Sequence, residues 1–569
     1  MNISEGSELG HGFGRRNWLL WTWLGLLGAA VSVVGALRAL WDPGEGRYGE
    51  IAREMVATGD WLVPHLNFVR YFEKPPLGYW LNAVSMKVFG VTEFAVRLPT
   101  ILSALACVIG IYWFSKKLSG ARVASLSAAV LATCVGFAAY AQIPELDMLL
   151  TALFCWALWC FYAGFELKIA PRLTLHLSYV LFSLGCLVKG PVSFVLGGAV
   201  IFWYLTLTRQ WNRWRDLYLP TGAALCALVT LPWFIAICAR DPKFFDFFII
   251  REHIQRFSSK VHHRTGGWWY FLPVLIGGMY PWICALPAAL KERFLKVRER
   301  GFAASRADIF MFLWFFLIFA FFSVSSSKRP PYILPVFPPL AFWIAQWLDS
   351  GVDNGGKLVR AFAVPLVFLN VLLGAAMIIA PQYIRDLGPE AARAFFLPGL
   401  FLLLSTVYLF VEIMRGRGAG IFYAVLSGTV IFVSLALFAS SSLDRMLSRK
   451  HMAGAIMREY KEGEVIISYD ANYERFFQSM SFYTGRRVLI YGVPGELEFG
   501  MQEEPRRDEY FLPHERAMKL LQSGTRVYLV AKQNKLKELA GYAETRLYGA
   551  PGPLSGQLVL VSNRPWSAK

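Results

Sequence analysis

An acid and a base stand side by side in the segment RYFEKPPLGYW, residues 70–80, as Glu73 and Lys74. Two prolines follow them, and aromatic residues flank the group on both sides. A lysine binds phosphate through its charge and its N–H donors, and a neighbouring carboxylate can act as an acid, a base or a cation ligand. The pair therefore predicts a site for an anionic substrate. The simpler alternative is that both charges anchor the chain at a membrane interface, before a helix whose first turn takes Pro75 and Pro76.

Further ionisable residues stand at the ends of apolar segments, where a charge is costly unless it faces a cavity or a partner. They are Asp42, Glu45, Asp147, Lys189, His253, Arg256 and Lys328. Several have an ordinary structural alternative: Asp147 in QIPELDMLL can start a helix, Lys189 in LVKGP can reach the lipid headgroups, and His253 in REHIQRF can be an interfacial histidine. Lys328 can likewise bind lipid phosphate without selectivity. If all of these residues lie at the same depth in the membrane, a shared site is favoured over these separate roles.

The composition is that of a polytopic membrane protein. Of the 569 residues, 56% are hydrophobic and 17% are charged, and the mean hydropathy is +0.43. The net charge of +18 fits the lysines and arginines that membrane proteins keep in cytoplasmic loops, so we expect no nucleic-acid partner. The 8 cysteines all fall in apolar segments without metal-ligand spacing, which indicates small buried side chains.

Apolar runs long enough to cross a bilayer recur from about residue 17 to about residue 440. They number about thirteen when the moderately apolar piece 76–92 is taken to lie along the outer surface. With the N-terminus inside, the predicted cytoplasmic loops carry most of the Lys and Arg, and everything after about residue 441 lies outside. This number of crossings places the ionisable candidates at the same depth, near the outer face of the membrane.

The predicted fold class is a polytopic α-helical membrane protein with a C-terminal soluble α/β domain. Its predicted parts are a cytoplasmic tail 1–16, a transmembrane domain 17–441 with outer loops 40–96 and 239–268, and an outer α/β domain 442–569. In this last part, short runs such as EVIISY and RVYLVA alternate with helical ones, which predicts strands and helices. It has no phosphate loop and no metal spacing, so no chemistry is assigned to it.

The first outer loop contains an amphipathic pattern in EGRYGEIAREMVATG. Its apolar residues recur at helical spacing, whereas Glu50, Arg53 and Glu54 face elsewhere, and Gly59 suits the helix end. We expect this helix to lie in the membrane interface.

Nothing in the chain resembles an ATP site, since the pattern GxxxxGK[ST] is absent. An enzyme on the outer face therefore needs an activated donor that arrives through the membrane. A sugar carried on a polyprenyl phosphate is such a donor, and the clustered cations suit its phosphate.

The segment GRYGEIAREMVATGDWLVPHLNFVRYFEKPPLGYW resembles the first outer loop of the ArnT-type membrane glycosyltransferases. These are the 4-amino-4-deoxy-L-arabinose lipid A transferases and their relatives, within the GT-C and protein-mannosyltransferase-like superfamily. The EKPPL block with its flanks is quite specific. Further matches follow in order along the membrane region: ELDMLL at 145–150, LVKGP at 187–191, EHIQRF at 252–257 and SKRPPYILPVFPPLA at 327–341.

The resemblance implies a GT-C fold of about thirteen transmembrane helices with a periplasmic α/β domain, in the bacterial inner membrane. It implies transfer of 4-amino-4-deoxy-L-arabinose from undecaprenyl phosphate to a phosphate of lipid A at the periplasmic face, a lipopolysaccharide modification linked to polymyxin resistance. Carried over by position, it places Glu73 and Lys74 at the donor phosphate. Its further substrate-binding positions are Tyr71, Asp147, Lys189, Arg256, Lys328 and Tyr332.

The chain departs from the family pattern at one catalytic position. The family usually has an acidic pair just before the RY of the interfacial helix, and here the aligned residues are Gly44 and Glu45. Asp42 or Glu45 is then the candidate catalytic carboxylate in place of the family's aspartate. Glu73 and Lys74 are the other two candidate catalytic residues. A phosphate acceptor is already ionised and needs no strong base, whereas a sugar hydroxyl acceptor needs one.

A divalent cation, Zn or Mg, held by Glu73 and His253 is a separate hypothesis, and two candidate ligands are few for a metal site. Two other functions stay open. A related GT-C transferase would use the same donor type with a different sugar or acceptor, such as lipopolysaccharide core, O-antigen or protein. A non-catalytic transporter of lipid-linked sugars would carry internal repeat symmetry, which the sequence does not show.

Overall fold

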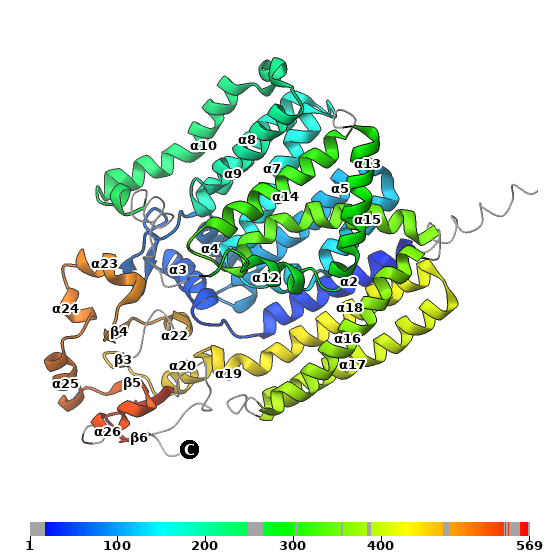
Figure 1. Cartoon of the computed structure of the whole chain (residues 1–569). Helices are drawn as coiled ribbons and strands as arrows, with labels where there is room; N and C mark the ends of the chain where they lie inside the picture. Colours follow the sequence, from blue (N-terminus) through cyan, green and yellow to red (C-terminus); the bar gives the residue numbers. More distant parts are fainter. Residues whose placement is uncertain are drawn as a thin grey trace, which may run out of the picture. The chain divides into compact units, whose positions relative to one another are not determined.

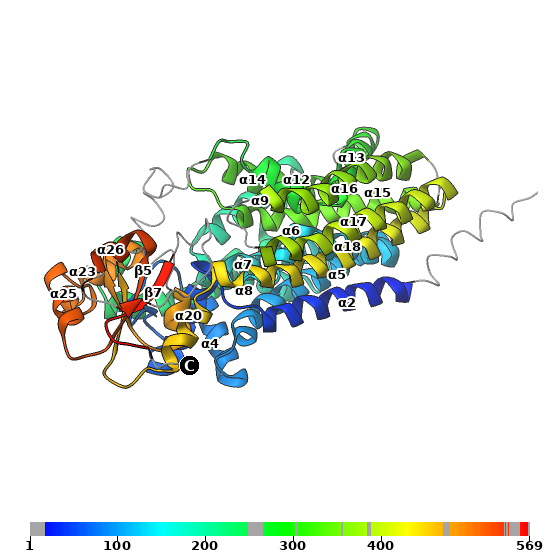
Figure 2. The same cartoon turned by 90° about the horizontal axis from the view of Figure 1, so that it is seen from below.

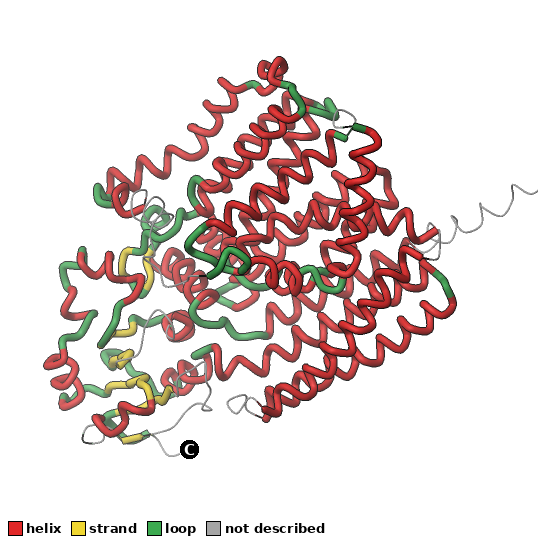
Figure 3. The backbone as a smooth tube through the Cα atoms, in the orientation of Figure 1, coloured by secondary structure: helices red, strands yellow, loops and turns green. Residues whose placement is uncertain are grey.

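The chain divides into two compact units in the computed structural model, and each unit is described by itself. The first comprises Met1–Ser32, Thr100–Met377 and Leu397–Leu437. The second comprises Val33–Pro99, Ile378–Phe396 and Phe438–Lys569. Helices dominate, and the strands belong to a short hairpin and to the C-terminal region (Figure 3). The structure describes residues 17–248, 266–301, 305–353, 357–383, 389–469, 478–539, 541, 544–545 and 558–566.

The first unit is built from apolar helices. Helices α7 (Leu146–Phe165), α8 (Pro171–Lys189), α9 (Val192–Leu207) and α14 (Arg306–Val324) lie side by side (Figure 1). The other described α-helices wholly in this unit are α6 (Val135–Tyr140), α10 (Leu219–Arg240), α12 (Phe271–Gly278), α13 (Leu286–Arg300) and α15 (Phe337–Asp353). Those with residues in both units are α2 (Asn17–Leu37), α5 (Glu93–Thr133), α16 (Lys357–Tyr383), α17 (Pro389–Arg415) and α18 (Gly418–Ser440).

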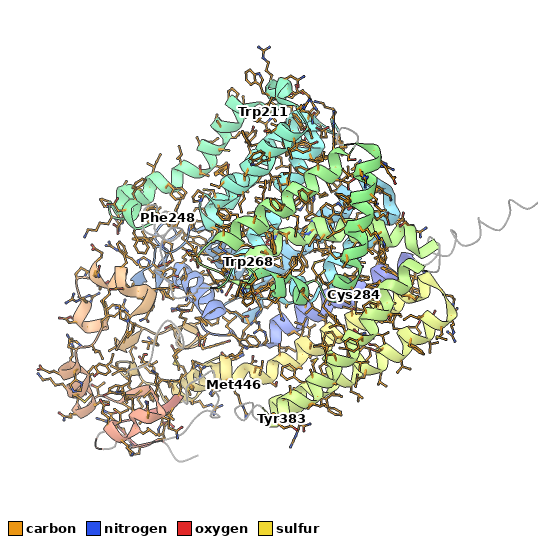
Figure 4. All side chains as sticks on the ribbon, in the orientation of Figure 1. Trp211, Phe248, Trp268, Cys284, Tyr383 and Met446 are labelled. Carbon is orange, nitrogen blue, oxygen red and sulfur yellow. The ribbon has the colours of Figure 1, made fainter. Side chains whose placement is uncertain are left out.

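Nine helices among the described residues are long and apolar enough to cross a membrane, or ten if the bent pair Phe271–Gly278 and Trp282–Arg300 forms one span. Helix α5 consists of two helices that meet at Gly120, whose φ of 85° and ψ of 174° are not helical. The count of about thirteen crossings stays a prediction. Large side chains are exposed along these helices, as lipid contact requires, and Trp211 and Tyr383 (Figure 4) suit a membrane interface.

The second unit contains the first predicted outer loop. The expected amphipathic helix is present as α3 (Gly44–Thr58), and it ends at Gly59, which takes the left-handed φ of 74°. A hairpin of β1 (His65–Leu66) and β2 (Val69–Arg70) follows it, antiparallel. Helix α4 (Leu77–Phe89) begins directly after the two prolines and packs on α3.

The polar side of α3 is buried, which the sequence pattern did not predict. Helix α22 (Gln478–Thr484) packs on α3, and Glu50 and Glu54 have no exposed surface. Arg53 donates to Glu50 at 2.6 and 2.8 Å, so these two charges compensate each other. Burial, and then the charge of Glu50, raise the pKa of Glu54 well above its usual value, so it can be buried as a neutral acid.

The C-terminal region forms the predicted α/β domain around a five-stranded sheet of order β4-β3-β5-β7-β6. Strands β3 (Val465–Tyr469), β4 (Val488–Tyr491) and β5 (Val527–Lys532) are parallel, while β7 (Leu558–Ser562) and β6 (Glu544–Thr545) add antiparallel. Helices α25 (His514–Gln522) and α26 (Leu536–Leu539) belong to this domain (Figure 2). They contribute Ala517, Leu521 and Leu539 to its core.

Candidate functional site

The predicted site residues fall into both units. The second unit holds Asp42, Glu45, Tyr71, Glu73 and Lys74, and the first unit holds Asp147, Lys189, Lys328 and Tyr332. His253 and Arg256 lie outside the described residues. Two groups of side chains surround the described candidates. We call them the arginine cluster (Arg38, Asp42, Glu45, Arg47, Arg97, Arg449, Glu496) and the lysine cluster (Glu145, Asp147, Lys189, Lys328, Arg329, Tyr332).

Glu45, in the first turn of α3, accepts hydrogen bonds from three directions. The guanidinium groups of Arg38 and Arg97 each form an ion pair with it, and the backbone N–H of Trp41 donates at 3.1 Å. Burial opposes the charge of Glu45, but the two guanidinium groups hold its pKa below its usual value. Glu45 is thus an ionised carboxylate held between two arginines, and a weak base.

Arg97 also closes the end of helix α2. Its two terminal nitrogens donate to the carbonyl oxygens of Gly35, Arg38 and Ala39 at 2.6–2.8 Å. A helix leaves its last carbonyl groups without partners inside the helix, and a buried cation satisfies them. Arg97 has no exposed surface. It therefore ties Glu45 to the end of α2.

Asp42 is the other carboxylate near Gly44, where the family pattern predicts an acidic residue. Its carboxylate accepts from the backbone N–H of Ser479 at 2.7 Å and from the Ser479 hydroxyl at 2.6 Å, and Arg449 lies 3.7 Å away. Burial raises the pKa of Asp42 to about 6, although Arg449 and Ser479 oppose the rise. The C-terminal region thus supplies the groups that hold Asp42.

Tyr71, just before the acid–base pair, is tied to the same region. Its hydroxyl donates to Glu496 at 2.6 Å, and Arg47 forms an ion pair with Glu496 and a 3.3 Å hydrogen bond to the Tyr71 oxygen. Burial raises the pKa of Tyr71 well above its usual value, so the phenol keeps its proton and stays a donor. Glu73 is buried beside this group, and the Lys74 ammonium donates to the carbonyl oxygen of Glu73 at 2.6 Å.

The lysine cluster joins the ends of helices in the first unit. Asp147, in the first turn of α7, forms an ion pair with Lys189, the last residue of α8. An acid at a helix start and a base at a helix end both suit the helix dipole. The Lys189 ammonium lies 4.5 Å from the centre of the Tyr332 ring, within cation–π range.

Two further groups complete the lysine cluster. Arg329 donates to both carboxylate oxygens of Glu145 at 2.7 and 2.8 Å. The Lys328 ammonium donates to the carbonyl oxygens of Ser323 and Ser325 at 2.6 Å, at the end of α14. Lys328 therefore satisfies carbonyl groups at the end of α14, and its assignment to the donor phosphate stays a prediction.

A metal site receives no support from the part of the chain that the structure describes, where no group of three or more His, Cys, Asp or Glu side chains could hold an ion. The hypothesis of a cation on Glu73 and His253 stays a prediction, since His253 is outside that part.

Sequence reasoning missed most of the partners in these clusters. Arg97 had a usable signal, because an arginine inside an apolar run such as TEFAVRLPTILSALA must be compensated. Glu145 stands two residues before Asp147 and was open to the same reasoning. Ser479 and Glu496 carry no signal, since they reach the loop from more than 400 residues away along the chain.

Known proteins resemble this chain along most of its length. The profile of a family described as dolichyl-phosphate-mannose-protein mannosyltransferase matches residues 73–235. The undecaprenyl phosphate-alpha-4-amino-4-deoxy-L-arabinose arabinosyl transferase of Pectobacterium carotovorum is 32% identical over 424 residues, which cover 72% of this chain and 69% of that protein. The protein of the same name from Erwinia tasmaniensis is 35% identical over 354 residues. That second match covers 60% of this chain and spans 62% of the relative's length.

Solved structures agree with the fold. The crystal structure of ArnT from Cupriavidus metallidurans bound to undecaprenyl phosphate has a TM-score of 0.82 and 27% identity, and the match covers 96% of this chain and 98% of that one. The oligosaccharyltransferase AglB from Archaeoglobus fulgidus has a TM-score of 0.53 at 11% identity, over 92% of this chain and 70% of that one, which is a likeness of fold alone. Together with the apolar helices and the C-terminal sheet, these matches confirm the predicted fold class.

Proposed function

The chain belongs to the family of the undecaprenyl phosphate-alpha-4-amino-4-deoxy-L-arabinose arabinosyl transferases, and we propose that it is itself a glycosyltransferase of the bacterial inner membrane. It moves 4-amino-4-deoxy-L-arabinose from undecaprenyl phosphate to a phosphate of lipid A at the periplasmic face. The observation that carries this proposal is the likeness, over nearly the whole of both chains, to an ArnT structure bound to undecaprenyl phosphate.

The reaction is a single displacement that inverts the anomeric carbon. A phosphate oxygen of the acceptor forms a bond to that carbon, the bond from the carbon to the donor's phosphate oxygen breaks, and undecaprenyl phosphate leaves with the bonding electrons. Negative charge grows on the leaving phosphate, and a cation placed there stabilises the transition state. Lys74 has this role in the proposal, and Glu73, next to it, helps to orient its ammonium group.

The carboxylate of Glu45, next to position 44, supports an acceptor that needs no base. Both oxygens of Glu45 are held by Arg38, Arg97 and the Trp41 N–H, and Asp42 accepts both hydrogen bonds of Ser479. Glu45 is a poor base, because its two guanidinium partners hold its pKa below its usual value. A phosphate of lipid A is ionised at neutral pH and attacks without losing a proton. Asp42, with the higher pKa, is the better candidate to orient it.

The lysine cluster has a separate role in the proposal. Lys189 is a compact charge on a flexible stem, and its partner Asp147 comes from the adjacent helix α7. We assign Lys189, with Tyr332, to the binding of a substrate's anionic group. Arg256 has the same assigned role from its position in the family motif.

The test is a transfer assay with the purified full-length chain in lipid vesicles. Undecaprenyl-phosphate-linked 4-amino-4-deoxy-L-arabinose is supplied with lipid A, and the products are identified by mass. The expected product is lipid A heavier by one aminoarabinose residue. Parallel reactions replace the donor by other undecaprenyl-phosphate sugars and the acceptor by lipid A without its phosphates. Transfer of another sugar, or transfer to the dephosphorylated acceptor alone, would contradict the proposal and favour a related transferase.

A further inference from the structure

The hairpin that leads into the acid–base pair has a tight turn. Its register pairs His65 with Arg70 and Leu66 with Val69, so only Asn67 and Phe68 form the turn. Both have positive φ angles, 57° and 60°, as a two-residue turn of this kind requires. Asparagine accepts this conformation readily, whereas phenylalanine resists it, so contacts around the turn must hold Phe68 in place.

Asn67 fastens the turn to the edge of the C-terminal sheet. Its side-chain nitrogen donates to the carbonyl oxygen of Val488 at 2.7 Å, and its side-chain oxygen accepts from the Val488 N–H at 2.9 Å. Strand β4, which contains Val488, is the last strand at one side of the sheet. The amide of Asn67 therefore satisfies both backbone groups of Val488, as a neighbouring strand would. Asn67 is almost completely buried, at 1% exposed.

Phe68 is held from two sides. Its backbone N–H donates to Glu54 of helix α3 at 2.8 Å, and its carbonyl oxygen accepts from Arg487 at 3.2 Å. The Arg487 guanidinium also lies 5.2 Å from the centre of the Phe68 ring. Arg487 directly precedes Val488, so the same short stretch of the C-terminal domain holds both turn residues.

The attachment continues toward the acid–base pair. The N–H of Tyr71 donates to the carbonyl oxygen of Pro64 at 2.9 Å, which extends the hairpin by one residue. A Cβ atom at Gly500 would lie 2.3 Å from the carbonyl oxygen of Arg70, so only glycine allows this close packing. The Tyr71 hydroxyl then reaches Glu496. Lys74 is thus three residues from a backbone that is fixed at several points.

We infer that Asn67 is a positioning residue for the transfer reaction: by docking the hairpin on strand β4, it makes the C-terminal domain set the place of Glu73 and Lys74. This inference rests on the proposed function. It assigns a positioning role in the reaction to the C-terminal α/β domain, to which no catalytic residue is assigned. A small misplacement of a group that stabilises the transition state lowers turnover strongly without removing ground-state binding.

The first test compares Asn67→Ala with the wild-type chain in the transfer assay with the aminoarabinose donor and lipid A. Loss of both hydrogen bonds to Val488 removes one of the attachments of the hairpin and lets it shift, and we expect kcat to fall at least about tenfold while KM for the donor changes less than about threefold. A merely structural residue would lower the amount of folded protein and leave kcat per folded molecule unchanged.

Asn563→Ala is the matched control. Its side-chain amide also joins backbone groups in the C-terminal domain, accepting from Val527 at 2.8 Å and donating to Thr525 at 3.0 Å, and these two partners do not belong to the hairpin. We expect this variant to lose thermal stability and to keep the wild-type kcat. An equal fall of kcat in both variants would overturn the inference.

Asn67→Asp adds a readout that depends on pH and does not require Asn67→Ala to fold. A protonated carboxyl group can donate to the Val488 carbonyl and accept from its N–H, whereas a carboxylate repels that carbonyl. The ratio of variant to wild-type kcat should therefore rise as the pH falls from about 8 to about 5.5. A flat ratio, or a wild-type kcat in Asn67→Ala, would overturn the inference. A wild-type chain without transfer would instead contradict the proposed function itself, and the inference with it.

Discussion

The arginine cluster and the lysine cluster use charge in different ways. In the arginine cluster, Glu45 is shared by two guanidinium groups, and all three side chains are almost fully buried, at 4% exposed or less. In the lysine cluster, Asp147 pairs with one ammonium group among the described residues, and Lys189 keeps 16% of its side chain exposed. Planar guanidinium groups suit fixed, multiply bonded networks, whereas an ammonium on a flexible stem can change partners.

This difference distinguishes residues that stabilise the fold from residues that can bind a substrate. Residues locked by several donors hold chain segments together, as Arg97 does for α2 and α3, and exchanging a partner for a substrate would leave a buried charge uncompensated. Lysines with one partner can bind a phosphate at smaller cost. We therefore expect variants of the first kind to change stability and variants of the second kind to change substrate kinetics.

The largest effect should come from Glu45→Gln. Removing its charge leaves Arg38 and Arg97 buried and facing each other without the carboxylate that they share, which should cost about 3–5 kcal/mol of stability. The measurement is the midpoint of thermal unfolding of the detergent-purified chain. Glu412→Gln is the control: Glu412 is also buried, but its partners Arg415 and Arg417 are more than half exposed and stay hydrated. Equal midpoints for the two variants would contradict the structural role of Glu45.

A smaller effect, visible only as a pH dependence, should come from Asp42→Asn. The pKa of Asp42 is about 6 in the folded chain, above about 3.9 for an exposed aspartate, so the folded state binds the proton more tightly. That contribution to stability is complete below about pH 4 and is lost as the pH rises through about 6, by up to about 3 kcal/mol. The difference in unfolding midpoint, wild type minus variant, should fall across this window.

Other groups titrate near Asp42 but cancel in that difference. Burial, and then the charges of Arg449 and Arg445, lower the pKa of His451 to about 4, and His451 is present in both proteins. Unfolding midpoints that run parallel against pH in the two proteins would show that Asp42 is ionised throughout the window.

The smallest of these effects should come from Lys189→Gln in the lysine cluster. The amide can still donate to Asp147 but carries no charge for a substrate phosphate. We expect KM for the donor or the acceptor to rise about tenfold, or about 1.4 kcal/mol, with a smaller stability loss than Glu45→Gln. Steady-state kinetics with each substrate varied in turn provide the measurement. An unchanged KM for both substrates would assign Lys189 to the helix ends alone.

The elements of the fold could largely be predicted from the sequence, because they depend on local patterns. The period of apolar residues and Gly59 placed helix α3, and runs of β-branched residues placed strands β3 and β5. The burial of Glu50 and Glu54 could not be predicted, since it depends on α22, which follows more than 400 residues later.

The candidate site could be predicted only in part, for the same reason. Glu73, Lys74, Asp147 and Lys189 stood out because charge near an apolar segment is costly. The ion pair of Asp147 with Lys189 was not predicted, nor was the hydrogen bond from Tyr71 to Glu496. Contacts between residues far apart in the sequence produce no characteristic spacing in it. The role of the C-terminal domain was missed altogether, since its motifs carry no chemistry of their own.

The central claim is that Lys74 stabilises the negative charge on the leaving phosphate of an undecaprenyl-phosphate donor. One measurement tests this claim most directly. Single-turnover transfer is followed in vesicles for the wild-type chain, for Lys74→Ala and for Lys87→Ala, whose lysine is exposed on the nearby helix α4. We expect Lys74→Ala to lose about 10²–10³-fold in rate with an unchanged unfolding midpoint, and Lys87→Ala to match the wild type. Transfer by Lys74→Ala at the wild-type rate would contradict the account.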